Sequence, residues 1–170
     1  MTGDSQPVVL SLGGNLGDRL RCLRDALAAL RALPGLTLTG VSGVYETEPV
    51  GLVEQPDFLN VVVLGVSTLT PGALLAQTQA IEAALGRVRT IPGGPRTIDI
   101  DLIQAGEAIS TDDRLTLPHP RAHERAFVLV PWLELDPDAG LVGRGRVADL
   151  VAGLDLAGVR RRGDLSIGRP

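Results

Sequence analysis

The amino-acid sequence predicts an α+β fold with a ferredoxin-like core, in which the elements follow in the order β-α-β-β-α-β and a C-terminal helical extension comes last. Two observations predict it. Short apolar runs typical of strands alternate with two stretches that place apolar residues at helical spacing, and glycine or proline separates them. The length of 170 residues also suits a single domain over 1–170. We expect an antiparallel sheet with helices packed on its faces and both core helices on one face. The core should span about 8–137, followed by a weakly patterned tail over 138–170.

The first half of the chain predicts one helix and three strand segments. Asp18 can cap the helix, and Pro34 ends it. Gly40 and Gly43 interrupt the second strand, which we expect to pair antiparallel with the third. The expected elements are a strand over 8–12, a helix between Asp18 and Pro34, a strand over 36–46, an irregular loop over 48–57 and a strand over 58–67.

The second half predicts a helix, a basic loop, a strand and a helical stretch. Thr70 and Pro71 form a helix start, and Gly86 ends that helix. The tail includes an arginine run at 160–162 that suits a disordered end. The expected elements are a helix over 70–85, a mobile loop over 87–96, a strand over 97–103 with a short partner at 107–109, and a helical stretch over 125–135 that bends near Pro131.

Composition excludes several classes of protein. Twenty acidic residues against sixteen basic ones give a net charge of −4, which argues against nucleic acid or an anionic membrane as the main partner. All sixteen basic residues are arginine, so the chain cannot form a lysine Schiff base or supply the lysine of a P-loop. The single cysteine, Cys22, excludes an internal disulfide and fits a cytoplasmic protein. We predict neither a signal peptide nor a membrane span.

The most informative motif places two aspartates two residues apart on a predicted strand. Asp99 and Asp101 then point to one side, while Ile98, Ile100 and Leu102 face the core. Two adjacent carboxylates repel each other unless a cation lies between them. Magnesium binds one or two carboxylates and completes its shell with water and phosphate oxygens, which predicts nucleotide chemistry with two ions. The alternative is an ordinary strand with a solvated acidic face.

Arginines next to this motif decide between the two interpretations. Arg96 directly precedes the aspartate strand, and Arg87 and Arg89 lie in the loop before it. A guanidinium group binds phosphate oxygens through two parallel hydrogen bonds and stays charged at any working pH. The alternative, solvated loop arginines in weak surface pairs, explains less of the pattern.

Three further motifs leave alternatives open. His119 lies between two prolines and could donate a hydrogen bond to a phosphate or be structural, while His123 is interpreted as a surface residue. The glycine loop at 13–18 lacks the first glycine of a dinucleotide fingerprint, so we interpret it as a tight turn in which Asn15 takes an unusual backbone angle. Phe58 and Asn60 could bind a flat heterocycle through an aromatic face and an amide, or could belong to the core.

Together these motifs resemble the 6-hydroxymethyl-7,8-dihydropterin pyrophosphokinase family of folate biosynthesis. The resemblance covers about residues 8–137, and the order and spacing of its parts make it specific. The segments that carry it are Leu12-Gly13-Gly14-Asn15-Leu16, Tyr45-Glu46-Thr47-Glu48-Pro49, Gln55-Pro56-Asp57-Phe58-Leu59-Asn60, Glu82-Ala83-Ala84-Leu85-Gly86-Arg87, Gly94-Pro95-Arg96-Thr97-Ile98-Asp99-Ile100-Asp101, Leu117-Pro118-His119-Pro120-Arg121 and Arg125-Ala126-Phe127-Val128-Leu129-Val130-Pro131.

The resemblance implies an enzyme that transfers the pyrophosphoryl group of ATP to the pterin hydroxymethyl group and releases AMP. It implies Mg²⁺ (two ions) as cofactor, ATP and the pterin as partners, and a cytoplasmic enzyme, which we expect to be a monomer. It implies catalytic roles for Arg96, Asp99, Asp101 and Arg87, with Asp99 and Asp101 as the metal ligands. It implies ATP contacts from Gln79, Glu82, Arg96, Leu102, His119 and Arg125, and pterin contacts from Thr47, Val50, Phe58, Asn60 and Phe127.

Two rival functions remain to be tested. A magnesium nuclease could use the same aspartate pair, although the net charge of −4 and the lack of a basic stripe oppose it. A regulatory module of ferredoxin-like fold could bind a small ligand without catalysis, but such a module needs no carboxylate pair beside arginines.

Overall fold

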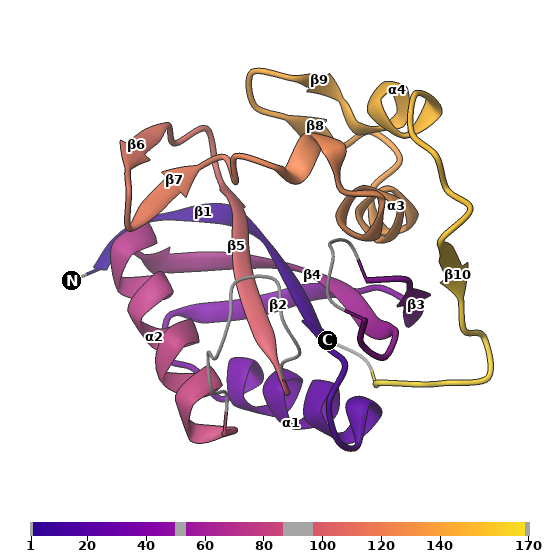
Figure 1. The fold of residues 1–170 in the computed structure, drawn as a ribbon. Coiled ribbons are helices and arrows are strands. Elements are labelled where there is room, and N and C mark those ends of the chain that lie inside the picture. Colours follow the sequence, from indigo (N-terminus) through magenta and orange to yellow (C-terminus); the bar gives the residue numbers. More distant parts are fainter. Residues whose placement is uncertain (1, 50–53, 87–96, 169–170) are drawn as a thin grey trace.

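The computed structural model describes residues 2–49, 54–86 and 97–168. Within these residues, six strands form one antiparallel sheet in the order β10-β3-β4-β1-β5, and β2 also pairs with β4 (Figure 1). Two small hairpins, β6–β7 and β8–β9, lie outside the sheet. The strands are β1 Thr2–Gly14, β2 Leu36–Val41, β3 Tyr45–Thr47, β4 Phe58–Leu69, β5 Asp99–Ala105, β6 Ser110–Asp112, β7 Leu115–Leu117, β8 Gly140–Leu141, β9 Gly145–Arg146 and β10 Val159–Arg161.

Both core helices lie on one face of the sheet, as the sequence predicts (Figure 1). The Asp18 carboxylate accepts a hydrogen bond from the Arg21 amide at 3.2 Å, and the Thr70 hydroxyl accepts one from the Ala73 amide at 3.2 Å, so both helices begin at the expected caps. Gly86 follows the second helix at φ +84°, a conformation that favours glycine. The helices are α1 Arg19–Arg31, α2 Pro71–Ala84, the 3₁₀ helix η1 Ala122–Glu124, α3 Ala126–Leu135 and α4 Val147–Ala152.

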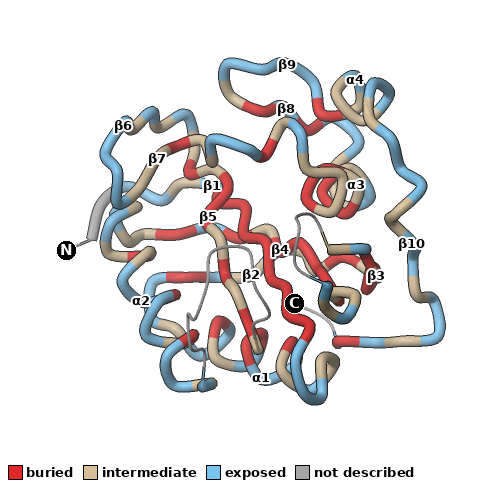
Figure 2. The backbone as a smooth tube through the Cα atoms, viewed as in Figure 1, coloured by how far each residue is buried: buried red, intermediate tan, exposed pale blue. Residues whose placement is uncertain are grey.

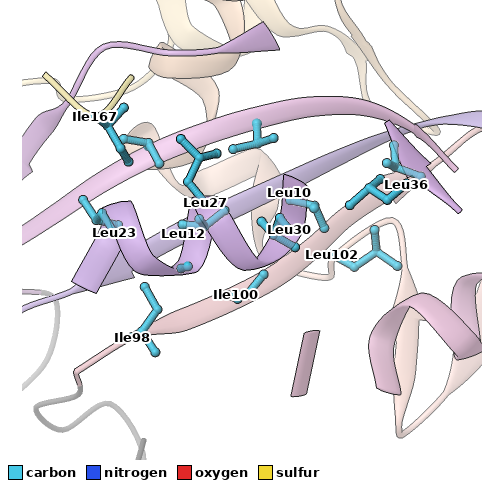
Figure 3. Packing of buried hydrophobic residues seen from close by; sticks show 14 of the residues in the cluster. Leu10, Leu12, Leu23, Leu27, Leu30, Leu36, Ile98, Ile100, Leu102 and Ile167 are labelled. Atoms are coloured by element: carbon cyan, nitrogen blue, oxygen red, sulfur yellow. The ribbon is translucent and has the colours of Figure 1, made fainter. Parts of the chain in front are cut away.

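The core between α1 and the sheet consists of aliphatic side chains, with leucine the most frequent (Figure 3). Leu23, Leu27 and Leu30 lie on one side of α1 and pack against Leu10 and Leu12 of β1. Burying such a side chain contributes roughly 2 kcal/mol, so this layer holds the centre of the sheet firmly. The sheet is therefore a rigid support for whatever its other face carries.

The opposite face of the sheet is covered by α3, which packs with α4 and the β8–β9 hairpin. Val9, Val62 and Ile103 point to this side and contact Val128 and Leu129 of α3. The buried residues follow β1 and β4 through the middle of the molecule (Figure 2). The prediction of an α+β fold with an antiparallel sheet and helices on its faces is confirmed.

The strand expected over 36–46 is divided into β2 and β3 around Gly43, as predicted, whereas Gly40 lies within β2. The Gly43 amide donates to the Glu134 carboxylate at 2.8 Å instead of to a neighbouring strand. The partner expected at 107–109 is wrong. The chain turns at Gly106, whose φ is +53° and whose amide donates to the Pro7 carbonyl, and β6 then pairs with β7 instead of with β5.

The interpretation of the arginine run at 160–162 as a disordered end is also wrong. Strand β10 pairs with β3, and the Arg161 guanidinium lies 3.0 Å from the Glu134 carboxylate. Arg24 donates two hydrogen bonds to the Ser166 carbonyl, and Ile167 enters the core beside Leu23 (Figure 3). Long-range ion pairs and the insertion of Ile167 into the core order this segment. No local sequence pattern predicts either of them.

Candidate active site

A cavity of about 520 Å³ opens on the α3 side of the sheet, beyond the N-terminal end of α3. Its floor is the sheet itself, where Ser11 and Gly13 of β1 line the cavity together with Asn60 of β4 and both aspartates of β5. In the paired strands, Gly13 stands opposite both Asn60 and Asp99, and Ser11 stands opposite Asp101. Residues opposite each other in an antiparallel pair point to the same face. The strand register therefore brings Asn60, predicted at the pterin, and the two aspartates, predicted at the metal, onto the same floor of the cavity.

The aspartates lie on the side of β5 that the sequence predicts. Ile98, Ile100 and Leu102 are almost fully buried in the α1–α2 core, whereas Asp99 and Asp101 are half-buried and line the cavity. The Asp101 carboxylate lies 3.7 Å from the Arg125 guanidinium. The two carboxylates therefore lie at the same edge of the cavity.

An amide and a hydroxyl occupy the other end of the floor. The Asn60 side chain is 4% exposed and donates to the Thr47 hydroxyl at 2.6 Å. Phe58 and Phe127 also line the cavity, and the Arg125 guanidinium lies 5.5 Å from the centre of the Phe127 ring. Two aromatic rings and a fixed amide in one cavity suit a flat heterocycle with hydrogen-bonding edges.

Asn15 has a different role from the one expected. Its φ is not positive, and it is Gly17 that takes a left-handed conformation in this turn, at +68°. The Asn15 amide instead donates to the Gln55 side chain at 2.9 Å and to the Pro56 carbonyl at 2.8 Å. These bonds attach the segment before Phe58 to the glycine turn, so Asn15 fixes the wall of the cavity.

His119 is neutral at physiological pH. Burial and then the charge of Arg125 lower its pKa to about 4, although Asp99 opposes the shift. Its Nδ1 accepts a hydrogen bond from the Arg121 amide at 3.2 Å, which leaves the proton on Nε2. A neutral imidazole held this way presents an N–H donor, the arrangement that the phosphate interpretation needs.

Three residues predicted to contact ATP lie on the side of β5 that faces α1 and α2. The buried Glu82 carboxylate accepts a hydrogen bond from the Ile100 amide at 2.7 Å. The Leu102 side chain is buried in the α1–α2 core, so it does not line the cavity, and Gln79 is exposed on α2. Glu82 therefore attaches α2 to the strand that carries the aspartates. Arg96, Arg87 and Val50, also predicted at the site, lie outside the described residues.

Several cavity residues were not predicted. Gly13 was interpreted as part of a tight turn and Ser11 as part of a strand, because the register that places them beside Asn60 and Asp101 is a property of the folded sheet. Asp155, Gly158 and Val159 come from the tail, where β10 closes one side of the cavity. The remaining ones are Glu48, Pro49, Arg121, Glu124 and Ala126. Glu48, Pro49, Arg121 and Ala126 belong to the motifs of the resemblance, but a site role was predicted only for their neighbours Thr47, Arg125 and Phe127.

Comparison with known proteins decides the family. The family model of 7,8-dihydro-6-hydroxymethylpterin-pyrophosphokinase matches residues 9–137. The chain belongs to this family. Relatives named 2-amino-4-hydroxy-6-hydroxymethyldihydropteridine pyrophosphokinase are similar along most of their length. The one from Methylorubrum extorquens is 45% identical, over 89% of this chain and 96% of its own. The one from Mycobacterium leprae is 48% identical, over 82% and 76%. The prediction of a pyrophosphokinase is confirmed.

A solved structure supports the fold. The crystal structure of Plasmodium falciparum HPPK-DHPS with pteroate matches 89% of this chain with a TM-score of 0.71 and 12% sequence identity. This chain spans 45% of that longer chain, so the likeness concerns one part of it and shows the fold alone. Among the described residues of the present chain, no helix is long and apolar enough to span a membrane.

Proposed function

We propose that the cavity over β1, β4 and β5 is where this pyrophosphokinase transfers the pyrophosphoryl group of ATP to the hydroxymethyl group of 6-hydroxymethyl-7,8-dihydropterin, releasing AMP. The observation that carries the proposal is the shared floor: one strand register brings a fixed amide at Asn60 and the carboxylates of Asp99 and Asp101 into a single cavity. One end suits the heterocycle, and the other suits a charged polyphosphate.

The pterin end is formed by three kinds of contact. Phe58 and Phe127 are placed to stack on the two faces of the ring system, and Asn60 is placed to hydrogen-bond to its edge while Thr47 holds the amide. Val50 joins this set by the family resemblance. Because the amide both donates and accepts, an Asn60 whose orientation is fixed discriminates among heterocycles by the pattern of their edge groups.

Mg²⁺ fits the donor set at the other end. The described residues contain no cluster of three or more metal-ligating side chains, as a dedicated protein cage for a metal would require. Magnesium needs only one or two carboxylates when phosphate oxygens and water complete its shell, and Asp99 and Asp101 supply these. Two bound ions would neutralise the charge of the triphosphate and of the oxygen that attacks it.

The remaining polar groups are assigned to the triphosphate. Arg125 already lies beside Asp101, and His119 presents its Nε2–H without adding a charge. Arg96 and Arg87 join them by resemblance. For Gln79 and Leu102 we propose contacts with the nucleotide at the edge of β5, where Leu102 can use only its main chain. Glu82 acts by holding the Ile100 amide.

In the proposed reaction the hydroxymethyl oxygen attacks the β-phosphorus of ATP. The new O–P bond forms as the bond from that phosphorus to the oxygen of AMP breaks, and the alcohol proton leaves to solvent. No side chain acts as a nucleophile, which suits a chain without lysine. This chain's residues orient two substrates and exclude water, and catalysis by positioning of this kind can supply most of the rate enhancement of phosphoryl transfer.

The test is a product analysis. Incubation with ATP, magnesium and 6-hydroxymethyl-7,8-dihydropterin should give AMP and the pyrophosphorylated pterin, with none when the metal is chelated. ADP instead of AMP, or turnover without the pterin, contradicts the proposal. The same preparation incubated with DNA and magnesium tests the nuclease. Binding of the pterin without any turnover would support the regulatory module.

We also propose that the chain acts as a single-domain, monomeric enzyme in the cytoplasm. The two apolar clusters lie on opposite faces of one sheet, which supports a single folding unit. The single cysteine is compatible with a reducing compartment. Sedimentation of the purified protein at micromolar concentration tests the monomer.

A further inference from the structure

The cavity floor contains one position without a side chain, and that position lies between the two proposed halves of the site. Gly13 on the central strand β1 stands opposite Asn60 on one neighbour and opposite Asp99 on the other. Neighbouring strands are about 4.8 Å apart. Only the backbone of Gly13 therefore separates the Asn60 amide on one side from the Asp99 carboxylate on the other. Gly13 itself lines the cavity.

The space above Gly13 is already used by Asn60. A Cβ atom at Gly13 would lie 2.3 Å from the Asn60 Oδ1 atom and 3.3 Å from its Cγ atom. The first distance is well below any real contact between these atoms, so the amide would have to move. The backbone of Gly13 is not in the left-handed region, and alanine could adopt it. The need for glycine here is therefore a need for space and not for backbone freedom.

The Asn60 amide has nowhere else to go without losing its partner. Its nitrogen donates to the Thr47 hydroxyl at 2.6 Å, and its oxygen is the atom that lies over Gly13. The side chain is 4% exposed, so rotation about its last bonds would leave a buried polar group unsatisfied. The missing side chain at position 13 and the hydroxyl at position 47 thus define the orientation of the amide from two sides.

We propose that Gly13 is a positioning residue for the pterin: it provides the space that orients Asn60 and keeps the floor open between the heterocycle and the aspartates. The proposal rests on the proposed function, in which Asn60 binds the heterocycle and Asp99 faces the polyphosphate. Substitution at Gly13 acts through Asn60. It should therefore weaken pterin binding while leaving the nucleotide end of the cavity intact.

The test is a double-mutant cycle between Gly13→Ala and Asn60→Ala. Affinity is measured by direct titration with the pterin alone and separately with a non-hydrolysable ATP analogue and magnesium. Gly13→Ala should weaken the pterin by about tenfold to a hundredfold, the effect of losing one buried hydrogen-bonding group. The ATP analogue should bind as it does to the unaltered chain. In the Asn60→Ala background, Gly13→Ala should change pterin affinity by less than about twofold.

Gly40→Ala is the matched control. Gly40 is also a strand glycine of this sheet, and a Cβ atom there would meet Leu135 at an ordinary contact distance of 3.6 Å. This variant should bind both ligands normally. Unchanged pterin affinity in Gly13→Ala overturns the proposal, and so does an equal loss for both ligands or the same loss in both backgrounds.

A folding defect is also informative. If Gly13→Ala does not fold, the double variant decides, because Asn60→Ala removes both atoms that would collide. A folded double variant that binds the ATP analogue supports the proposal, and an unfolded one overturns it. The unaltered chain separates this inference from the proposed function: if it neither binds the pterin nor forms AMP, the function fails, whereas normal binding with a silent Gly13 variant overturns the inference alone.

Discussion

The α3 face of the sheet has two halves built on the same three strands. In one half Val9, Val62 and Ile103 pack under α3, and in the other Ser11, Asn60 and Asp101 line the cavity. On each strand the two halves are two residues apart, so the same strands support both. The halves differ in their side chains and in the covering helix, and a shift of the β1–β5 register lies between them. The active site is thus a continuation of the core in which apolar side chains are replaced by polar ones.

This comparison separates stability from function along single strands. Apolar residues under α3 contribute free energy of folding through burial, whereas the half-buried aspartates beyond it are partly solvated and contribute little. Substitutions of these aspartates should therefore reduce turnover and leave the free energy of unfolding almost unchanged. Substitutions in the apolar half should do the opposite.

The largest effect is expected for Asp101→Asn. It removes a charge that we assign to metal binding, and the loss of several kcal/mol of transition-state stabilisation corresponds to on the order of a hundredfold or more in turnover. The fold should remain, because Asp101 is half-buried at the cavity edge. Turnover with saturating ATP and pterin, together with urea unfolding, measures both quantities. Glu107→Gln, an exposed carboxylate just beyond the same strand, is the control. Full activity of Asp101→Asn would remove the aspartates from the reaction.

The opposite outcome is expected two residues further along β5, at Ile103. Its side chain is fully buried under α3, and Ile103→Ala removes three carbon atoms from a packed cluster. The free energy of unfolding should fall by about 2–5 kcal/mol. Turnover per folded molecule should stay within about twofold, because the residue is outside the cavity. Urea unfolding and active-site titration provide the two numbers. A large loss of turnover in fully folded protein would show that the two halves are not independent.

The sequence predicted the two core helices and the aspartate strand because their signals are local. Capping residues at Asp18 and Thr70 and apolar residues at helical spacing reappear as α1 and α2, and alternation at 98–102 reappears as the two sides of β5. Tertiary contacts override local patterns elsewhere. The partner expected at 107–109 is replaced by a turn in which the Gly106 amide donates to the Pro7 carbonyl. The tail is ordered by contacts with residues 27 to 142 positions away in the sequence, so its pattern carried no signal.

The candidate site shows the same division. Asp99, Asp101, Asn60, Thr47, Phe58, Phe127 and Arg125 were each visible in a motif, and the fold brings them into one cavity or to its edge. Gly13 looked like part of a turn, and its position between Asn60 and Asp99 depends on strand register across three distant segments. Glu82 looked like a nucleotide residue, but its carboxylate is bonded to the Ile100 amide. A motif indicates which residues matter, while register decides what they contact.

The tail extends the comparison to the outer wall of the cavity. Glu46 is hydrogen-bonded by Arg160 at 2.6 Å, Arg19 at 2.8 Å and Arg162 at 3.2 Å, so one carboxylate joins the tail to α1 and β3. Glu46→Gln should lower the free energy of unfolding by about 1–3 kcal/mol, because a carboxylate with three charged partners is replaced by a neutral amide. Asp164→Asn, which removes an exposed partner of Arg162, should lower the free energy of unfolding less than Glu46→Gln does.

The pH dependence of this effect has a defined sign. The hydrogen bonds from Arg160 and then Arg19 hold the pKa of Glu46 below its ordinary value of 4.5. A carboxyl with a lowered pKa stabilises the fold above its unfolded pKa, and the contribution is lost as the pH falls through its folded pKa. The difference in unfolding free energy between the unaltered chain and Glu46→Gln should therefore be complete at pH 7 and should shrink below about pH 4.5. A difference that grows in acid would contradict the assignment.

His119 lies at the boundary between the two halves. The smallest effect of these predictions is expected here, because the ionisation of its ring should not change activity near neutral pH. Its amide donates to the Ile103 carbonyl at 2.8 Å, while Asp99 on the cavity floor and Arg125 and Arg121 beside it act on the charge of its ring. Burial, followed by the charge of Arg125, lowers its pKa to about 4, so in the metal-free protein its imidazole should remain neutral from about pH 5.5 to 8. NMR chemical shifts of the ring, assigned by comparison with His119→Gln, should be flat over this range.

The same shift affects stability in the same direction as that of Glu46, but over a higher range of pH. The unfolded chain binds the His119 proton below about pH 6.5, and the folded chain does not bind it until about pH 4, so the fold loses stability as the pH falls across this window. His119→Gln should remove that part of the pH dependence. A ring that titrates near pH 6.5 would mean that His119 is solvated, and the neutral phosphate donor that we assign at the boundary would then be wrong.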